Sequence, residues 1–208
     1  MRGKFITFEG FEGSGKSTHI KLLARFLRQK GYPVLVLREP GSTKAGELIR
    51  KILLNKKNKS IFARTELLLY LAARAQIVEE KIIPALRKGK IVLCDRFHDA
   101  TVAYQGYGLG LDSRLIDIMG KFATYGVVPD LTLLLEIGIE EGLRRIGRNR
   151  DRIEQRSLNY HRRVREGYLK IAKQQPRRVK IVKVDKEIKT TQGQIRRIIA
   201  EFLCLSKI

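Results

Sequence analysis

The segment of residues 10–17, which reads GFEGSGKS, constrains this chain more than any other feature. It follows a short apolar run at residues 5–8 and precedes a stretch with helical character at residues 17–30. A strand, a glycine-rich loop and a helix in this order form a P-loop, in which backbone N–H groups and the helix N-terminus surround a phosphate. Lys16 would reach the β- and γ-phosphates, and the Ser17 hydroxyl would ligate Mg²⁺. The sequence therefore predicts a site for a nucleoside triphosphate rather than an empty glycine turn.

The composition is typical of a single globular domain. The chain has 208 residues, of which 43% are hydrophobic and 31% are charged, so it can bury a large core and is not a disordered chain. No N-terminal apolar stretch has the length of a signal peptide or a membrane span, and we expect a cytoplasmic protein without a membrane partner. The two cysteines, Cys94 and Cys204, have apolar neighbours and no metal spacing, so we expect both to be buried.

The charge of the chain is strongly positive. It has 43 lysine and arginine residues against 21 aspartate and glutamate residues, a formal net charge of +22. This charge makes nucleic acid a partner to consider. However, no basic stretch is interleaved with aromatic residues, and no helix resembles one that reads a groove. We therefore expect a basic, solvated surface that attracts small anionic substrates, and we do not expect nucleic acid to be a partner.

Apolar runs that favour strands alternate with helical segments along the chain. The predicted strands cover residues 5–9, 34–38, 91–95, 131–136 and 180–185, and the predicted helices cover residues 17–30, 45–55, 64–88, 113–123, 139–146, 156–175 and 190–205. Most of these strands are apolar throughout, as in parallel sheets that are covered on both faces. The pattern predicts an α/β fold of the P-loop NTPase type with three layers, in which helices flank a five-stranded parallel sheet. We expect one domain over residues 1–208, with ligands at the carboxyl ends of the strands.

Polar residues follow two of the predicted strands. Asp95 can hold Mg²⁺, usually through water, and Arg96 can bind a phosphate with two N–H groups. After the second strand, Arg38 and Glu39 offer a cation and an acid, and Pro40 gives a rigid turn. Taken alone, the first segment could be a structural ion pair and the second an ordinary turn. The P-loop nearby favours one ligand site to which both segments contribute.

Two further segments have both a structural and a functional interpretation. Tyr70 and Arg74 share a helix face, so the ring can stack on a base and the arginine can bind it. Taken alone, a half-buried tyrosine with a solvated arginine is the simpler interpretation. Residues 144–152 are rich in arginine and contain a glycine. They could form a mobile lid that closes over the triphosphate and neutralises its charge, or an exposed basic loop, or a nucleic-acid contact.

Together, these segments resemble the thymidylate kinase family, of the bacterial type, within the superfamily of P-loop nucleoside monophosphate kinases. The resemblance runs from residue 5 to about residue 185. Besides the P-loop it rests on residues 38–41 (REPG), 67–76, 95–97 (DRF), 101–106 (TVAYQG), 129–135 (PDLTLLL), 151–154 (DRIE) and 167–169 (GYL). The order and spacing of these segments identify the family, which a P-loop alone would not do.

The resemblance implies transfer of the γ-phosphoryl group of ATP to dTMP, giving dTDP and ADP, a step in dTTP synthesis for DNA replication. It implies Mg²⁺ as the cofactor, with Ser17 and Asp95 as metal-binding residues, and a homodimer as the assembly. The residues that would bind ATP are Gly10, Phe11, Glu12, Gly13, Ser14, Gly15, Lys16, Ser17 and Thr18.

The resemblance also implies an acceptor site and catalytic residues. The residues that would bind dTMP are Arg38, Glu39, Pro40, Tyr70, Arg74, Arg96, Thr101, Tyr104 and Gln105. Tyr70 would stack on thymine, Arg74 would bind the base, and Tyr104 would crowd the 2′ position of a ribonucleotide. The residues that would act in catalysis are Glu12, Lys16, Arg96, Arg148, Arg150 and Arg152. This P-loop has no arginine, and family members of that kind carry catalytic arginines in the lid, so all three lid arginines are candidates.

Two positions depart from the family pattern, and two other functions compete. Ser42 replaces the second glycine usual after REPG, and Phe97 stands where tyrosine or histidine is common. A kinase for another nucleoside monophosphate such as UMP is the nearest rival, against which Tyr70, Arg74 and Tyr104 argue. The charge of +22 suggests the other rival, a P-loop ATPase that binds nucleic acid.

Overall fold

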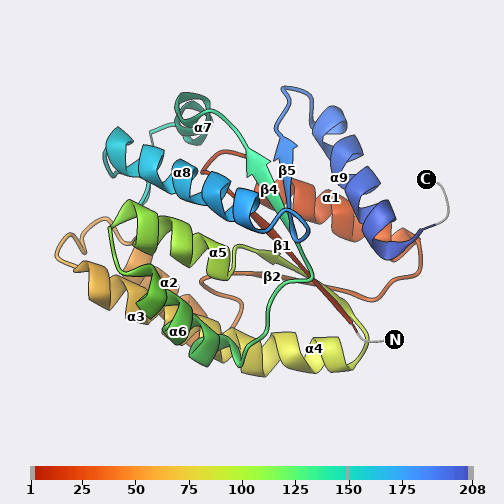
Figure 1. Cartoon of the computed structure of the whole chain (residues 1–208), viewed down its shortest axis with the longest axis horizontal. Helices are drawn as coiled ribbons and strands as arrows, with labels where there is room; N and C mark the ends of the chain where they lie inside the picture. Colours follow the sequence, from red (N-terminus) through yellow and green to blue (C-terminus); the bar gives the residue numbers. More distant parts are fainter. Residues whose placement is uncertain (1–2, 149, 206–208) are drawn as a thin grey trace.

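The computed structural model describes residues 3–148 and 150–205 (Figure 1). Its centre is a sheet of five parallel strands in the order β2-β3-β1-β4-β5. The strands are β1 (Lys4–Gly10), β2 (Val34–Arg38), β3 (Ile91–Asp95), β4 (Leu131–Glu136) and β5 (Val179–Lys183). The predicted α/β fold with a five-stranded parallel sheet is thus confirmed. Asn149 of the predicted lid and the ends of the predicted 1–208 domain lie outside the described residues.

Helices cover both faces of the sheet, because alternate residues of its strands are apolar on each face. Ile6 and Phe8 of β1 pack in a core with α1 (Lys16–Gln29) and α9 (Ile188–Leu203), which lie side by side in Figure 1. On the opposite face, Phe5 packs against Ile77 and Ile82. Leu134 of β4 packs on that face as well, with α8 (Leu158–Gln174). The result is the three-layer arrangement that the alternating pattern predicts.

The remaining helical segments connect these layers. They are α2 (Lys44–Leu54), α3 (Ala63–Ile77), η1 (Val78–Ile82), α4 (Ile83–Arg87), α5 (His98–Thr101), η2 (Val102–Gly108), α6 (Ser113–Thr124) and α7 (Ile139–Ile146). The side chains of Thr43, Asp112 and Ser157 cap α2, α6 and α8 by accepting a backbone N–H bond. None of the described helices combines the length and the apolar character that crossing a membrane requires.

Three details of the secondary structure differ from the predictions. Residues 64–88 do not form one continuous α-helix, because the π-helical segment η1 separates α3 from α4. Pro84 accounts for the interruption, since its nitrogen has no hydrogen to donate to the preceding turn. The helical segments α5 and η2 were not predicted. Cys94 is buried as predicted, but Cys204, for which burial was also predicted, is exposed. It follows α9 directly and has a left-handed backbone conformation.

The close packing of α6 against α5 gives a first testable prediction. A Cβ atom on Gly120 would overlap the imidazole ring of His98. We expect Gly120→Ala to lower the free energy of unfolding by about 1–3 kcal/mol, because a packed ring cannot move aside freely. Urea unfolding measures this cost. The same substitution in a His98→Ala background should cost less, and equal costs in both backgrounds would contradict the packing.

Candidate active site

The P-loop, which connects β1 to α1, holds its lysine at its centre. Gly10 and Gly15 have φ angles of 129° and 83°, conformations that favour glycine. Lys16 is 8% exposed, and its Nζ donates to the carbonyl oxygens of Gly10 at 3.0 Å and Phe11 at 2.9 Å. Burial lowers the pKa of Lys16 to about 8. A loop that curls around an ammonium group at a helix N-terminus is suited to bind phosphate groups.

The P-loop also touches the backbone of α7, the helix that leads into residues 144–152. A Cβ atom on Gly13 would overlap the carbonyl group of Gly142. A Cβ atom on Gly142 would in turn overlap the carbonyl oxygen of Glu12. The two backbones therefore meet at a point that has no room for a side chain.

The two residues predicted to bind a metal lie next to each other. The Ser17 hydroxyl, on the first turn of α1, donates to Asp95 Oδ2 at the end of β3, over 2.7 Å. Both groups are oxygen ligands of the kind that Mg²⁺ prefers. Among the described residues, no group of three or more histidine, cysteine or carboxylate side chains could hold a metal. The pair fits a magnesium ion whose other ligands are phosphate oxygens and water.

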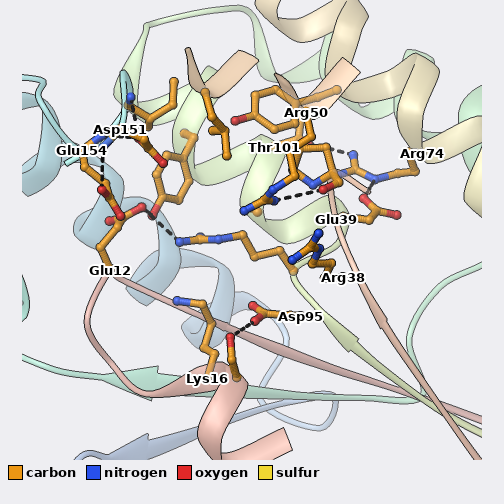
Figure 2. Close-up of a pocket in the computed structure, with 18 of the residues that line it drawn as sticks. Glu12, Lys16, Arg38, Glu39, Arg50, Arg74, Asp95, Thr101, Asp151 and Glu154 are labelled. Carbon is orange, nitrogen blue, oxygen red and sulfur yellow. Dashed lines mark hydrogen bonds and ion pairs between the residues drawn. The ribbon is translucent and has the colours of Figure 1, made fainter. Parts of the chain in front are cut away.

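A polar cavity of about 280 Å³ opens beside the P-loop, at the carboxyl ends of β2 and β3 (Figure 2). From the predicted site it is lined by Glu12, Gly13, Lys16, Ser17, Arg38, Glu39, Pro40, Tyr70, Arg74, Asp95, Arg96, Thr101, Tyr104 and Gln105. The predicted residues Gly10, Phe11, Ser14, Gly15 and Thr18 do not line it, and neither do Arg148, Arg150 and Arg152. The structure thus brings the P-loop and every predicted acceptor residue to one cavity.

Arg74 of α3 ties one wall of the cavity together. Its side chain is buried, with Nε donating to Glu39 Oε2 at 2.7 Å. Nη1 donates to the Thr101 hydroxyl at 2.7 Å, and Nη2 donates to the Phe97 carbonyl at 2.9 Å. Figure 2 shows Arg74 beside Glu39 and Thr101, with Lys16 and Asp95 below them in this view. Arg74 is therefore not the solvated side chain of the simpler sequence interpretation, and its contacts join α3 to the ends of β2 and β3.

Arg96 lies on the wall nearest the P-loop and has several partners. Its Nη2 donates to Glu12 Oε1 at 3.0 Å, and Nη1 donates to the Tyr168 hydroxyl at 3.1 Å. The guanidinium group also lies 4.8 Å from the centre of the Tyr104 ring, whose hydroxyl donates to Glu12. Glu12 Oε2 is buried without a partner among the described residues. This wall therefore presents a fixed cation next to a carboxylate with free hydrogen-bonding capacity.

The three arginines of the predicted lid differ in their surroundings. Arg152 is buried, with Nε bonded to the Leu53 carbonyl at 2.7 Å and Nη2 bonded to Glu66 Oε2 at 2.6 Å. Among the described residues, the Arg150 guanidinium makes only long bonds, at 3.3 Å to the Gly147 carbonyl and 3.4 Å to the Leu143 carbonyl. Arg148 is exposed. Arg152 thus anchors the C-terminal end of residues 144–152, whereas Arg148 is exposed and Arg150 is only partly buried.

Several cavity residues were given no role by the sequence reasoning. They are Arg50, Leu54, Ala100, Asp151, Ile153 and Glu154. Arg50 of α2 donates to the Pro40 carbonyl at 3.0 Å, which places it over the turn after β2. Arg50 lies seven residues, about two helical turns, after the cap residue Thr43, so the sequence places both on one face of α2. Asp151 and Glu154 are the only acids in the sequence of residues 144–156. That they reach the cavity can be seen only from the fold.

The fold and the cavity define a class of protein. A P-loop at the end of a central parallel strand, with a second polar site directly beside it, is the arrangement of a P-loop nucleotide-binding protein with room for a second ligand.

Comparisons with known proteins identify the family. A family model described as thymidylate kinase matches residues 8–195. The thymidylate kinase of Thermoanaerobacter sp. (strain X514) is 47% identical over 204 residues, covering 98% of this chain and 100% of the relative. That of Caldanaerobacter subterraneus subsp. tengcongensis is 46% identical over 209 residues, covering all of both chains. The crystal structure of thymidylate kinase from Ehrlichia chaffeensis superposes with a TM-score of 0.80 at 33% identity, covering 96% of this chain and 100% of that one. The chain belongs to the thymidylate kinase family.

A buried carboxylate beneath the site gives a pH-dependent prediction. Burial raises the pKa of Glu9 from its ordinary 4.5 to about 7, which the nearby Asp99 charge reinforces. Between pH 4.5 and 7 the folded chain therefore holds more protons here than the unfolded chain, so stability declines as pH rises through this window. We expect Glu9→Gln, which cannot ionise, to remove about 3 kcal/mol of this decline.

Urea unfolding at several pH values between 4.5 and 8 tests this prediction. The matched control is Glu201→Gln, which neutralises an exposed carboxylate on α9 and should leave the pH profile unchanged. A profile for Glu9→Gln that runs parallel to that of the unsubstituted chain would contradict the assignment.

Proposed function

We propose that this chain transfers the γ-phosphoryl group of ATP to dTMP, giving dTDP and ADP. Its membership of the thymidylate kinase family supports this reaction. The observation that carries it is that Lys16 and Ser17 of the P-loop line the same cavity as Tyr70 and Tyr104. A donor phosphate on the P-loop and an acceptor phosphate in the cavity would therefore lie next to each other. Phosphoryl transfer depends mainly on this positioning and on neutralising charge.

The cavity offers matching groups for each part of dTMP. Arg38 and Arg96 supply positive charge for the acceptor phosphate, and the ring of Tyr70 supplies a face for the base. Arg74 uses one hydrogen of each terminal nitrogen on Thr101 and Phe97, which leaves the second hydrogens for a base carbonyl. Tyr104 contacts both Glu12 and Arg96 and lines the cavity beside them, where its ring would crowd a 2′-hydroxyl. The further contacts assigned to dTMP come from Glu39, Pro40, Thr101 and Gln105.

Mg²⁺ is the cofactor that the Ser17–Asp95 pair fits. Ser17 would bind it directly, and Asp95 would hold it directly or through water. When bound, the ion neutralises charge on the phosphate oxygens during transfer.

We assign residues 144–152 as a lid over the triphosphate, with Arg148 and Arg150 as its transition-state arginines. Among the described residues, the Arg150 guanidinium makes only long hydrogen bonds, so this side chain can turn toward a phosphate at little cost. Arg152 has a different role, since its buried ion pair with Glu66 would have to break before the side chain could reach a phosphate. In this assignment Arg152 fixes the lid, and Arg148 and Arg150 neutralise charge.

A homodimer is proposed through the face formed by α6 and α3. Leu115, Ile118 and Phe122 of α6 follow helical spacing and are 47%, 69% and 86% exposed. Phe62, which caps the N-terminus of α3, and Leu68 of α3 are exposed as well, and the two helices pack together through Leu67 and Ile116. An exposed apolar face of this kind is typical of a protein–protein interface. A cytoplasmic location and the absence of a nucleic-acid partner remain predictions.

The reaction is tested by measuring ADP formation from ATP and Mg²⁺ with dTMP, dUMP, UMP, CMP, AMP and GMP supplied separately. We expect dTMP to be the best acceptor and UMP to be negligible. Lys16→Ala should lower kcat at least about a hundredfold, because it removes a preorganised cation from the transferring phosphate. Lys21→Ala, an exposed lysine on the same helix, is the control.

Other outcomes have distinct meanings. Activity led by UMP or another monophosphate would keep the P-loop assignment and overturn the base pocket. ATP hydrolysis that depends on DNA and not on any monophosphate would favour the P-loop ATPase instead.

The homodimer is tested with Phe122→Glu. A charge at Phe122, the most exposed of the three apolar residues on α6, should convert the dimer to a monomer at micromolar concentration, as measured by analytical ultracentrifugation. Leu158→Glu, which places the same charge on an exposed apolar site of α8, should stay dimeric. A monomeric unsubstituted chain, or two variants that behave alike, would contradict this interface.

A further inference from the structure

The backbone at Arg96 is held in an uncommon conformation by buried groups. Arg96 has a φ angle of 69°, in the left-handed region that a non-glycine residue rarely adopts. Its N–H donates to the Phe8 carbonyl at 2.9 Å. The next N–H, of Phe97, donates to Glu9 Oε1 at 2.7 Å. The carboxylate of Glu9 therefore fixes the turn from which the Arg96 side chain leaves β3.

The same carboxylate reaches the Arg96 side chain through a tyrosine. Tyr168 of α8 donates its hydroxyl hydrogen to Glu9 Oε2 at 2.8 Å. Its oxygen accepts a hydrogen bond from Arg96 Nη1 at 3.1 Å. Glu9 is fully buried and Tyr168 is 3% exposed, so water does not compete for these bonds. One oxygen of Glu9 thus fixes the backbone that follows Arg96, and the other holds the Arg96 side chain through Tyr168.

The cavity side of Arg96 stays open. The bonds to Tyr168 and Glu12 use two of the five N–H groups of the guanidinium. The side chain is 20% exposed where it lines the cavity. The groups behind it are therefore buried, and the remaining N–H groups are available to a ligand.

We propose that Glu9 and Tyr168 are positioning residues that hold Arg96 ready for the acceptor phosphate. The proposal rests on the function proposed above, in which Arg96 binds that phosphate. An arginine side chain loses rotamer freedom when it binds, and a guanidinium that is already fixed pays this cost during folding instead. Groups that orient a binding residue without touching the ligand commonly affect activity tenfold or more.

The unfavourable placement of Glu9 supports this role. A carboxylate in a fully buried position lowers stability, and burial raises the pKa of Glu9 to about 7. An apolar side chain beside Tyr168 would avoid that cost if packing were the only requirement. A buried acid that bonds only to the turn and the tyrosine behind Arg96 is what a positioning role requires.

The first experiment compares two tyrosines on α8. Tyr168→Phe removes the hydroxyl between Glu9 and Arg96, and we expect kcat/KM for dTMP to fall about tenfold while KM for ATP changes less than twofold. Tyr160→Phe is the matched control, because Tyr160 is equally buried and also packs against Tyr104, but it does not touch Arg96. Equal effects of the two substitutions, or equal effects on both substrates, would overturn the proposal.

The second experiment asks whether Tyr168 acts through Arg96. Affinity for dTMP is measured by calorimetry for the unsubstituted chain, Tyr168→Phe, Arg96→Ala and the double variant. If the tyrosine works through the arginine, adding Tyr168→Phe to Arg96→Ala changes the affinity less than twofold. Fully multiplicative effects would overturn the proposal. Unchanged affinity in Arg96→Ala alone would instead remove the acceptor-binding role of Arg96, which is a failure of the proposed function.

Glu9→Gln provides an independent variant in case Tyr168→Phe does not fold. The amide can still accept from the Phe97 N–H group but cannot accept from the Tyr168 hydroxyl with its nitrogen. We expect the same selective loss for dTMP as in Tyr168→Phe. Normal dTMP kinetics in folded Glu9→Gln would exclude the role of Glu9.

Discussion

The parallel pairing of β1 with β3 is the constraint on which the site depends. In this register Phe8 lies opposite Asp95, so the P-loop and the Asp95–Arg96 turn leave the sheet at the same edge. The pairing of β2 with β3 places Arg38 opposite Asp95 as well. A shift of register in either pair would separate the Ser17 hydroxyl from the Asp95 carboxylate and move Arg38 away from the cavity. The hydrogen bonds of the sheet thus set the distances between the P-loop, Asp95 and Arg38.

Buried ion pairs then fix the walls around this edge. Arg74 pairs with Glu39, and Glu66 pairs with both Arg152 and Arg156. Each pair joins elements that are distant in sequence, and Arg74 and Arg152 donate further hydrogen bonds to the Thr101 hydroxyl and the Leu53 carbonyl. Glu39 Oε1 is buried without a partner among the described residues. Pairs of this kind contribute little net stability, since desolvation offsets most of the attraction, but breaking one leaves a buried charge. Their effect here is to give the cavity one shape.

Local sequence patterns predict the strands and the P-loop. Contacts between residues that are far apart in the sequence decide the surroundings of individual site residues. The strands and the P-loop could be read from apolar runs and glycine spacing, because those signals lie within a few residues. The convergence of Asp95, Arg96 and Glu39 followed from the general rule for parallel sheets. Arg152 could not be distinguished from Arg148 in the same way, because its partner Glu66 is 86 residues away.

The same limit applies to the supporting residues. Glu9 reads as part of an apolar strand, and Tyr168 reads as one aromatic residue on an amphipathic helix. Only the fold shows that they meet, since 159 residues separate them. The break in the helix at residues 78–82 has a different origin, because Pro84 is a local signal in the sequence, and the prediction of one helix over residues 64–88 is wrong there.

The contact between Gly13 and Gly142 restricts how this sequence can change. Both residues already lack a side chain, so neither can shrink to accommodate growth at the other. An alanine at one position cannot be compensated by any substitution at its partner, and only a shift of the whole α7 backbone would make room. The separation between the P-loop and α7 is therefore set by two backbones in direct contact. A variant with a side chain at either glycine therefore needs the α7 backbone to move as a whole relative to the P-loop.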